Sequence, residues 1–154
     1  MLFKSPDHWK FYNEKFSSGG ITSDCYHRAL VYTLGICDDT RLRFDEIYDK
    51  KKRSIVSGVI SAGWQTAGSL RATRLAFNLF TDNTPTSFSC GDSESQQHDA
   101  LEECKKYSVS DVFCCEFAPF FFQAIAIRYP EYLKSFSFSN DNINGGKASN
   151  FYFE

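Results

Sequence analysis

Apolar residues recur every three or four positions through most of the chain, the period of helices that bury one face. Ser5 begins the first such stretch as a helix cap, and Trp9, Tyr12 and Phe16 then fall on one side of the helix. Two further helices are predicted: one from Thr22 or Ser23 to Gly35, and one from Asp38-Asp39 to the basic residues 50–53. The chain therefore belongs to the mainly α class.

Residues 69–80 are apolar on nearly every side, so we predict that they form the central, most buried helix. A short helix is predicted over 97–106. Ser108 and Asp111 have the spacing of a capping box that begins a last long helix, and Pro119 kinks or splits it. Five or six helices result, in a single domain over residues 1–154.

Two segments break the helical period. Residues 81–97 are rich in Thr, Asn, Ser and Pro, which predicts a surface loop. Residues 134–154 alternate polar and aromatic side chains on both sides of an Asn-Gly turn, as in Phe136 and Phe138 between serines. We expect a small C-terminal β-hairpin there.

Composition narrows the possible functions. The net charge of -2 differs from the basic balance of a general nucleic-acid-binding protein, and no apolar run reaches the roughly 20 residues of a membrane span. The N-terminus has no signal-peptide pattern, so we expect a cytoplasmic protein without membrane contact. Aromatic residues make up 17% of the chain, which indicates an aromatic core or rings reserved for a partner.

The six cysteines have none of the spacings that zinc sites use. They are Cys25, Cys37, Cys90, Cys104, Cys114 and Cys115. In a reducing compartment they are expected to be free thiols, and no metal or other cofactor is expected.

The strongest polar constellation lies on the predicted central helix. Arg71, Arg74 and Asn78 are spaced to share one face, and Ser69 stands at its start. This stripe, with Trp64, Gln65 and Thr66 in the loop before it, suits a bound anion or a partner. The alternative is structural pairing, with Glu116 in an apolar run as the partner of Arg74. We expect pairing for Arg74 and a ligand contact for Arg71.

Other candidates are weaker. His27, next to Arg28, has the chemistry of an acid or base, although a helix-flank histidine is more often structural. The basic run of Lys50, Lys51, Lys52 and Arg53 suits nucleic acid or an acidic protein surface. No nucleophile motif or glycine-rich phosphate loop is present in the sequence, so no catalytic residue is assigned.

Several unusual strings occur between residues 1 and 133. They include Ala62-Gly63-Trp64-Gln65-Thr66, Thr73-Arg74-Leu75-Ala76-Phe77-Asn78-Leu79-Phe80 and Cys114-Cys115-Glu116-Phe117-Ala118-Pro119. With them the chain resembles a domain-of-unknown-function family of short proteins from Gram-positive bacteria, phages and integrative elements. The resemblance implies a setting and supplies no site residues.

Three functions remain open. The favoured one is a non-enzymatic accessory factor of a phage or mobile element that binds a protein, such as a CRISPR or other anti-phage nuclease that it inhibits. The first alternative is a small-ligand or nucleotide-binding protein, or an enzyme, that uses Arg71, Arg74 and Glu116. The second is a nucleic-acid-associated regulator.

Overall fold

The computed structural model describes residues 1–87 and 93–133. The elements, in chain order, are α1 (Pro6–Ser17), α2 (Cys25–Gly35), α3 (Asp38–Leu42), α4 (Phe44–Ile47), β1 (Tyr48–Asp49), β2 (Ser54–Ile55), the 3-10 helix η1 (Ser57–Ser61), α5 (Ala67–Thr81), α6 (Glu94–Lys105), α7 (Val109–Phe113) and α8 (Ala118–Arg128). The mainly α prediction is confirmed. The predicted C-terminal hairpin over 134–154 lies outside the described residues, as does part of the predicted 81–97 loop.

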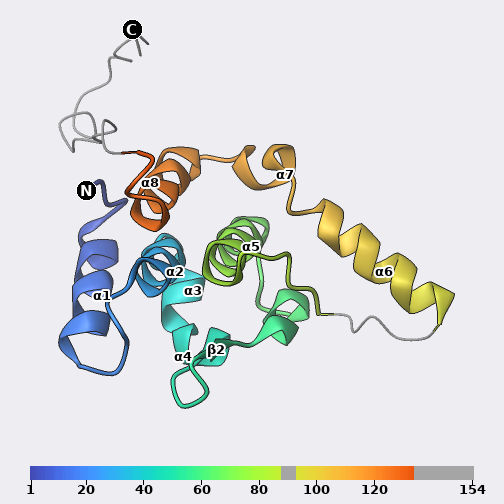
Figure 1. The fold of residues 1–154 in the computed structure, drawn as a ribbon, viewed down its shortest axis with the longest axis horizontal. Helices are drawn as coiled ribbons and strands as arrows, with labels where there is room; N and C mark the ends of the chain where they lie inside the picture. Colours follow the sequence, from blue (N-terminus) through green and yellow to red (C-terminus); the bar gives the residue numbers. More distant parts are fainter. Residues whose placement is uncertain (88–92, 134–154) are drawn as a thin grey trace, which may run out of the picture.

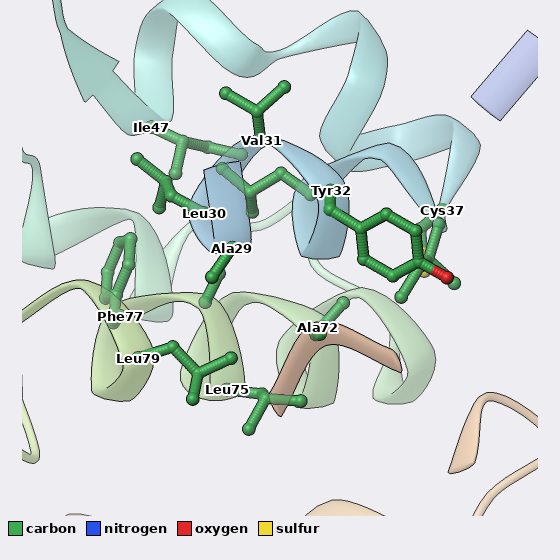
Figure 2. Packing of buried hydrophobic residues seen from close by; sticks show 14 of the residues in the cluster. Ala29, Leu30, Val31, Tyr32, Cys37, Ile47, Ala72, Leu75, Phe77 and Leu79 are labelled. Carbon is green, nitrogen blue, oxygen red and sulfur yellow. The ribbon is translucent and has the colours of Figure 1, made fainter. Parts of the chain in front are cut away.

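Helices α2 and α5 together form the centre of the molecule, with α1 and α8 packed against α2 (Figure 1). Every residue of α2 from Ala29 to Gly35 is buried. Figure 2 shows Ala29 pointing toward α5, where Ala72 and Phe77 lie. Small side chains at this crossing let the two backbones approach closely. The predicted central helix therefore shares its position with α2, because both are enclosed by other helices.

Helix α1 begins as predicted, since the Ser5 hydroxyl accepts the backbone N–H of His8 at 3.1 Å. Of the three residues on the predicted face, Tyr12 is buried and Phe16 packs against the core, but Trp9 is 56% exposed, and the fully buried His8 lies beside it in the chain. His8 Nδ1 lies 3.2 Å from the backbone N–H of Lys4, and Nε2 lies 2.8 Å from the carbonyl of Tyr32. Nδ1 therefore accepts and Nε2 donates, so both ring nitrogens of the buried histidine are satisfied.

The third predicted helix is wrong beyond residue 47. Short helices α3 and α4 are followed by β1 and β2, which pair antiparallel with Tyr48 opposite Ile55. Residues 50–53 form the turn between them rather than a helix end. The Asp49 carboxylate accepts the backbone N–H groups of Lys51 and Lys52 at 2.9 and 3.0 Å, and such local bonds compete with the helical pattern.

Two other boundaries shift. Asp24, rather than Thr22 or Ser23, caps α2 by accepting the His27 N–H at 2.9 Å. Helix α6 begins three residues earlier than predicted, because Ser93 caps it. The long C-terminal helix splits into α7 and α8, and Pro119 stands in the first turn of α8, where its missing N–H costs nothing.

Candidate functional site

The two arginines of the predicted stripe contact helices α6 and α7. Arg74 donates from Nε and Nη2 to one carboxylate oxygen of Glu103, at 3.0 and 2.8 Å. The other oxygen of Glu103 accepts from Lys106 Nζ at 3.0 Å. Arg74 and Glu103 are 9% and 5% exposed. Structural pairing of Arg74 therefore occurs with a partner on α6.

The predicted partner, Glu116, was wrong. Glu116 is exposed and lies in the connection between α7 and α8. The apolar run around it predicted a buried position, but the split of the helix turns this stretch into a surface connection. A glutamate there keeps its hydration and needs no cation.

The other two residues of the stripe, Arg71 and Asn78, also donate hydrogen bonds to backbone carbonyls of the protein. Arg71 Nε donates to the carbonyl of Asp111 in α7 at 2.8 Å. Asn78 Nδ2 donates to the carbonyl of Asn83 at 3.0 Å. Within the stripe, Arg71 therefore joins α5 to α7, and Arg74 joins α5 to α6. Asn78 joins α5 to the loop that follows it.

The residues before α5 close its N-terminus. Thr66 is the cap, and its hydroxyl accepts the Ser69 N–H at 3.2 Å while the Ser69 hydroxyl accepts the Thr66 N–H at 2.7 Å. Ser69 also donates to Gln65 Oε1 at 2.6 Å. Trp64 is half-buried, with the Arg43 guanidinium 5.1 Å from its ring centroid. This capping box satisfies backbone donors that an anion would otherwise use.

His27 is buried and joins α2 to β1. Its Nδ1 lies 2.7 Å from Asp24 Oδ2, and its Nε2 lies 2.9 Å from the hydroxyl of Tyr48. Tyr48 is 2% exposed, and burial raises the pKa of its hydroxyl. The arrangement fixes the start of the short sheet and leaves the ring without an open face.

The basic run lies on the turn between β1 and β2. Lys50, Lys51 and Lys52 are exposed there. Lys50 pairs with Asp45 at 2.8 Å and Lys52 lies 3.9 Å from Asp49, while Arg53 donates to the hydroxyl of Thr22. Neighbouring carboxylates therefore neutralise much of this positive charge.

A groove opens between α5, α7 and α8, with a volume of about 230 Å³. We call it the apolar groove. Its lining consists of Leu75, Asn78, Leu79, Tyr107, Val109, Val112, Phe113, Ile125 and Tyr129. Asn78 is the one predicted site residue among them. The others were not predicted from the sequence because they come from three separate stretches of the chain, 75–79, 107–113 and 125–129, which meet only in the folded structure.

The polar groups of the apolar groove are engaged by the chain itself. The Tyr107 hydroxyl donates to the carbonyl of Pro85, and the Tyr129 hydroxyl lies 3.3 Å from Asp82 Oδ1. Burial raises the pKa of Tyr107, so this phenol stays neutral. The lining therefore offers apolar contact rather than acid–base chemistry.

The arginine stripe positions one wall of the apolar groove. Tyr107, Val109 and Val112 belong to the segment that Arg74 and Arg71 fasten to α5 through Glu103 and Asp111. The two arginines are thus positioning residues for a binding surface. The lining of the apolar groove does not include the other predicted site residues, Trp64, Gln65, Thr66, Ser69, Glu116 and His27.

Other kinds of site are not supported in the described part. Within residues 1–87 and 93–133, no three His, Cys, Asp or Glu residues gather where a metal ion would bind. Cys25, Cys37, Cys104, Cys114 and Cys115 are free thiols, and Cys90 lies outside the described residues. No described helix combines the length and apolar composition that crossing a membrane requires.

Comparison with known proteins gives one match. The chain matches a family of unknown function, DUF6075, over residues 1–141. No curated protein and no solved structure matches it. Since the match covers all of the described helices, the chain belongs to the DUF6075 family.

Proposed function

We propose that this chain is a non-enzymatic, protein-binding accessory factor, and that the apolar groove receives an apolar segment of its partner. The observation that carries the proposal is the lining of the groove, which is built from aliphatic and aromatic side chains whose few polar atoms are bonded within the chain. Such surfaces bind by burying apolar area.

The size of the apolar groove favours a protein partner. Its volume of about 230 Å³ is below the roughly 300–1,000 Å³ of small-molecule sites. Protein interfaces commonly place one or two large side chains in a desolvated pocket of this kind. Val109, which is 75% exposed at the mouth, would be covered by the partner.

The two alternatives have less support. An anion site or enzyme built on Arg71, Arg74 and Glu116 requires these residues to converge, yet each arginine bonds to a different element and Glu116 is exposed elsewhere. A nucleic-acid interface at residues 50–53 would have to displace the bonds to Asp45 and Asp49.

The biological setting is part of the proposal. The resemblance to short proteins of Gram-positive bacteria, phages and integrative elements favours an accessory factor of a mobile element. Such factors often act by binding and blocking a host machine. The partner we propose is therefore a host defence protein, with CRISPR and other anti-phage nucleases as the first candidates.

Two matched variants test the binding surface. Val109→Glu places a charge at the mouth of the apolar groove, and Leu101→Glu makes the same change on α6, at a residue that is 63% exposed and does not line the groove. Tagged full chains would be used to capture proteins from a Gram-positive host. A partner retained by the wild type and Leu101→Glu but lost with Val109→Glu supports the proposal. Equal capture by all three would contradict it.

A second assay addresses the setting. The same three chains would be expressed in cells that carry a defined anti-phage nuclease system, and phage plating efficiency would be measured. Recovery of plating with the wild type and Leu101→Glu alone is expected. If plating never recovers across a panel of nuclease systems while groove-dependent capture persists, protein binding stands and the anti-nuclease role is wrong.

A further inference from the structure

Apolar surface continues from the apolar groove along α8. Phe122 and Ile125 in this helix and Tyr129 at its C-terminal cap are spaced i, i+3 and i+7, so they share one face. Ile125 and Tyr129 line the groove, and Phe122 is 52% exposed with its ring 5.2 Å from that of Phe113, another lining residue. We call Phe122, Ile125 and Tyr129 the α8 row. It is about 10 Å long, at the helical rise of about 1.5 Å per residue.

This arrangement suits a helix as the bound element. Amphipathic helices bind in apolar grooves through side chains spaced i, i+3 or i+4, and i+7, which recur over the same length as the α8 row. The groove, with a volume of about 230 Å³, receives one or two such side chains, and the next would rest on Phe122. Val109, which is 75% exposed on the α7 wall, would contact the bound helix from the other side.

The exposed charges around the apolar groove and the α8 row are acidic. Asp111 lies between lining residues of α7, Glu116 follows Phe113 by three positions, and Glu131 follows Tyr129 by two. All three acidic residues are exposed. A carboxylate therefore stands beyond each end of the α8 row, and another stands on the α7 wall.

Basic residues do little to offset these carboxylates. In residues 107–133, Arg128 is the one Lys or Arg, and it is buried with its guanidinium bonded to Asp82. Among the neighbouring residues, Lys106 is paired with a glutamate of α6, and Arg71 donates to a backbone carbonyl of α7. The surface that a bound helix would face is therefore apolar along its middle and negative at its edges.

We infer that the partner's bound segment is a basic amphipathic helix. Its apolar side chains would contact the apolar groove and the α8 row, and its Lys or Arg side chains would lie toward Glu116 and Glu131. The inference rests on the proposed function, because it specifies the partner of the same groove. Apolar contact supplies the affinity, while opposite charges at the edges speed association and select a basic segment over an acidic one.

Three synthetic peptides test the inference with the purified full chain. Each has roughly 14 residues, or four helical turns, with Leu at the same helically spaced positions and Lys, Gln or Glu at all others. Fluorescence anisotropy of the labelled peptides gives each Kd. The wild type is expected to bind the Leu/Lys peptide about tenfold more tightly than the Leu/Gln peptide and the Leu/Glu peptide most weakly. High salt should reduce this preference.

Matched charge variants separate a local effect from the effect of net charge. Glu116→Lys/Glu131→Lys should weaken binding of the Leu/Lys peptide by about tenfold and strengthen binding of the Leu/Glu peptide. Glu94→Lys/Asp99→Lys makes the same change in charge at two exposed positions of α6, and its Kd for the Leu/Lys peptide should stay within about twofold of the wild-type value. Equal weakening by the two double variants would overturn the inference, because only net charge would then matter.

Apolar variants distinguish failure of this inference from failure of the proposed function. Val109→Ser and Phe122→Ser should weaken binding of the Leu/Lys peptide, whereas Leu101→Ser, at an exposed position of α6, should not. If the wild type binds the Leu/Lys and Leu/Gln peptides equally and both variants still lose them, the basic partner is wrong and the proposed function stands. Binding that neither variant weakens would contradict both. A wild type that does not bind the Leu/Lys peptide would overturn the inference, and the capture experiment would still decide the proposed function.

Discussion

Arg74 and Glu103 form a buried ion pair between α5 and α6, in which one carboxylate oxygen receives two guanidinium N–H bonds. Lys106 binds the second oxygen from the surface. The pair joins the core of the fold to the segment that walls the apolar groove. Stability and binding are therefore expected to depend on the same contact.

Breaking this pair should destabilise the fold. Arg74→Met or Glu103→Gln leaves the other group buried without its partner, and we expect a loss of about 3 kcal/mol in the free energy of unfolding, at the low end for buried pairs because most of α6 is exposed. Arg74→Met/Glu103→Leu should cost less than the sum of the single changes. Urea unfolding measures both effects. Glu116→Gln, at an exposed site, is the control and should change stability by less than about 0.5 kcal/mol.

Gly35 should not tolerate a side chain. A Cβ there would lie 2.5 Å from Cδ2 and 2.9 Å from Nε2 of His8, and 3.1 Å from Phe11. Gly35→Ala is therefore expected to lower stability by about 1–3 kcal/mol despite the better helix propensity of alanine. At Gly58 the added Cβ would meet no atom within 4 Å, so Gly58→Ala is the matched control. A thermal midpoint as high for Gly35→Ala as for the wild type would refute this packing role.

His8 should make the protein sensitive to mild acid. Burial, aided by the charges of Arg41 and Lys4 and opposed by the bond to Tyr32, lowers its pKa from 6.5 to about 4. The unfolded chain therefore binds a proton between these values that the folded chain does not bind. Stability should fall by about 3 kcal/mol as the pH decreases from about 6.5 to about 4.

The variant His8→Gln separates this effect from the titration of carboxylates. It should weaken the pH dependence between 4 and 6.5, whereas His98→Gln, at an exposed site, should retain the wild-type slope. Urea midpoints measured across this range provide the comparison. Parallel curves for all three proteins would show that His8 does not control acid stability.

Asp82 ends α5 with a φ of 54°, a left-handed conformation that usually favours glycine or asparagine. Its carboxylate accepts from Arg128 Nη2 at 2.8 Å through both oxygens. Asp82→Asn keeps the backbone preference and removes the charge, so a loss of about 1 kcal/mol is expected, limited by the half-exposure of Asp82. The loss should shrink in high salt. A gain in thermal midpoint would mean that the ion pair contributes nothing.

Helices were predictable where their signals are local. The cap at Ser5, the stop at Gly35 and the apolar period over 69–80 all depend on neighbouring residues, and the structure has helices there. Residues 50–53 show how a local signal misleads. Their charges suit a helix end, but one carboxylate at Asp49 binds two backbone N–H groups and makes a turn.

The candidate site was less predictable because it depends on distant contacts. The sequence indicated that Arg74 needs a carboxylate as partner. However, α6 has the sequence of a polar surface helix, and no neighbouring residue shows that Glu103 is the one acidic side chain of α6 that is buried. Likewise Leu75, Val112 and Ile125 meet only after three helices have packed. Asn78 was found for its spacing with the arginines, not for its place in the groove.

Helix α6 extends from the body and buries only Ala100 and Glu103 (Figure 1). A segment held by so few contacts can open without unfolding α2 and α5, so its amide hydrogens should exchange through sub-global opening long before those of the centre. The Arg74–Glu103 pair then sets the free energy of that opening. Tyr107, two residues after the end of α6, lines the apolar groove, so opening of α6 should loosen that wall of the groove while the centre of the fold stays intact.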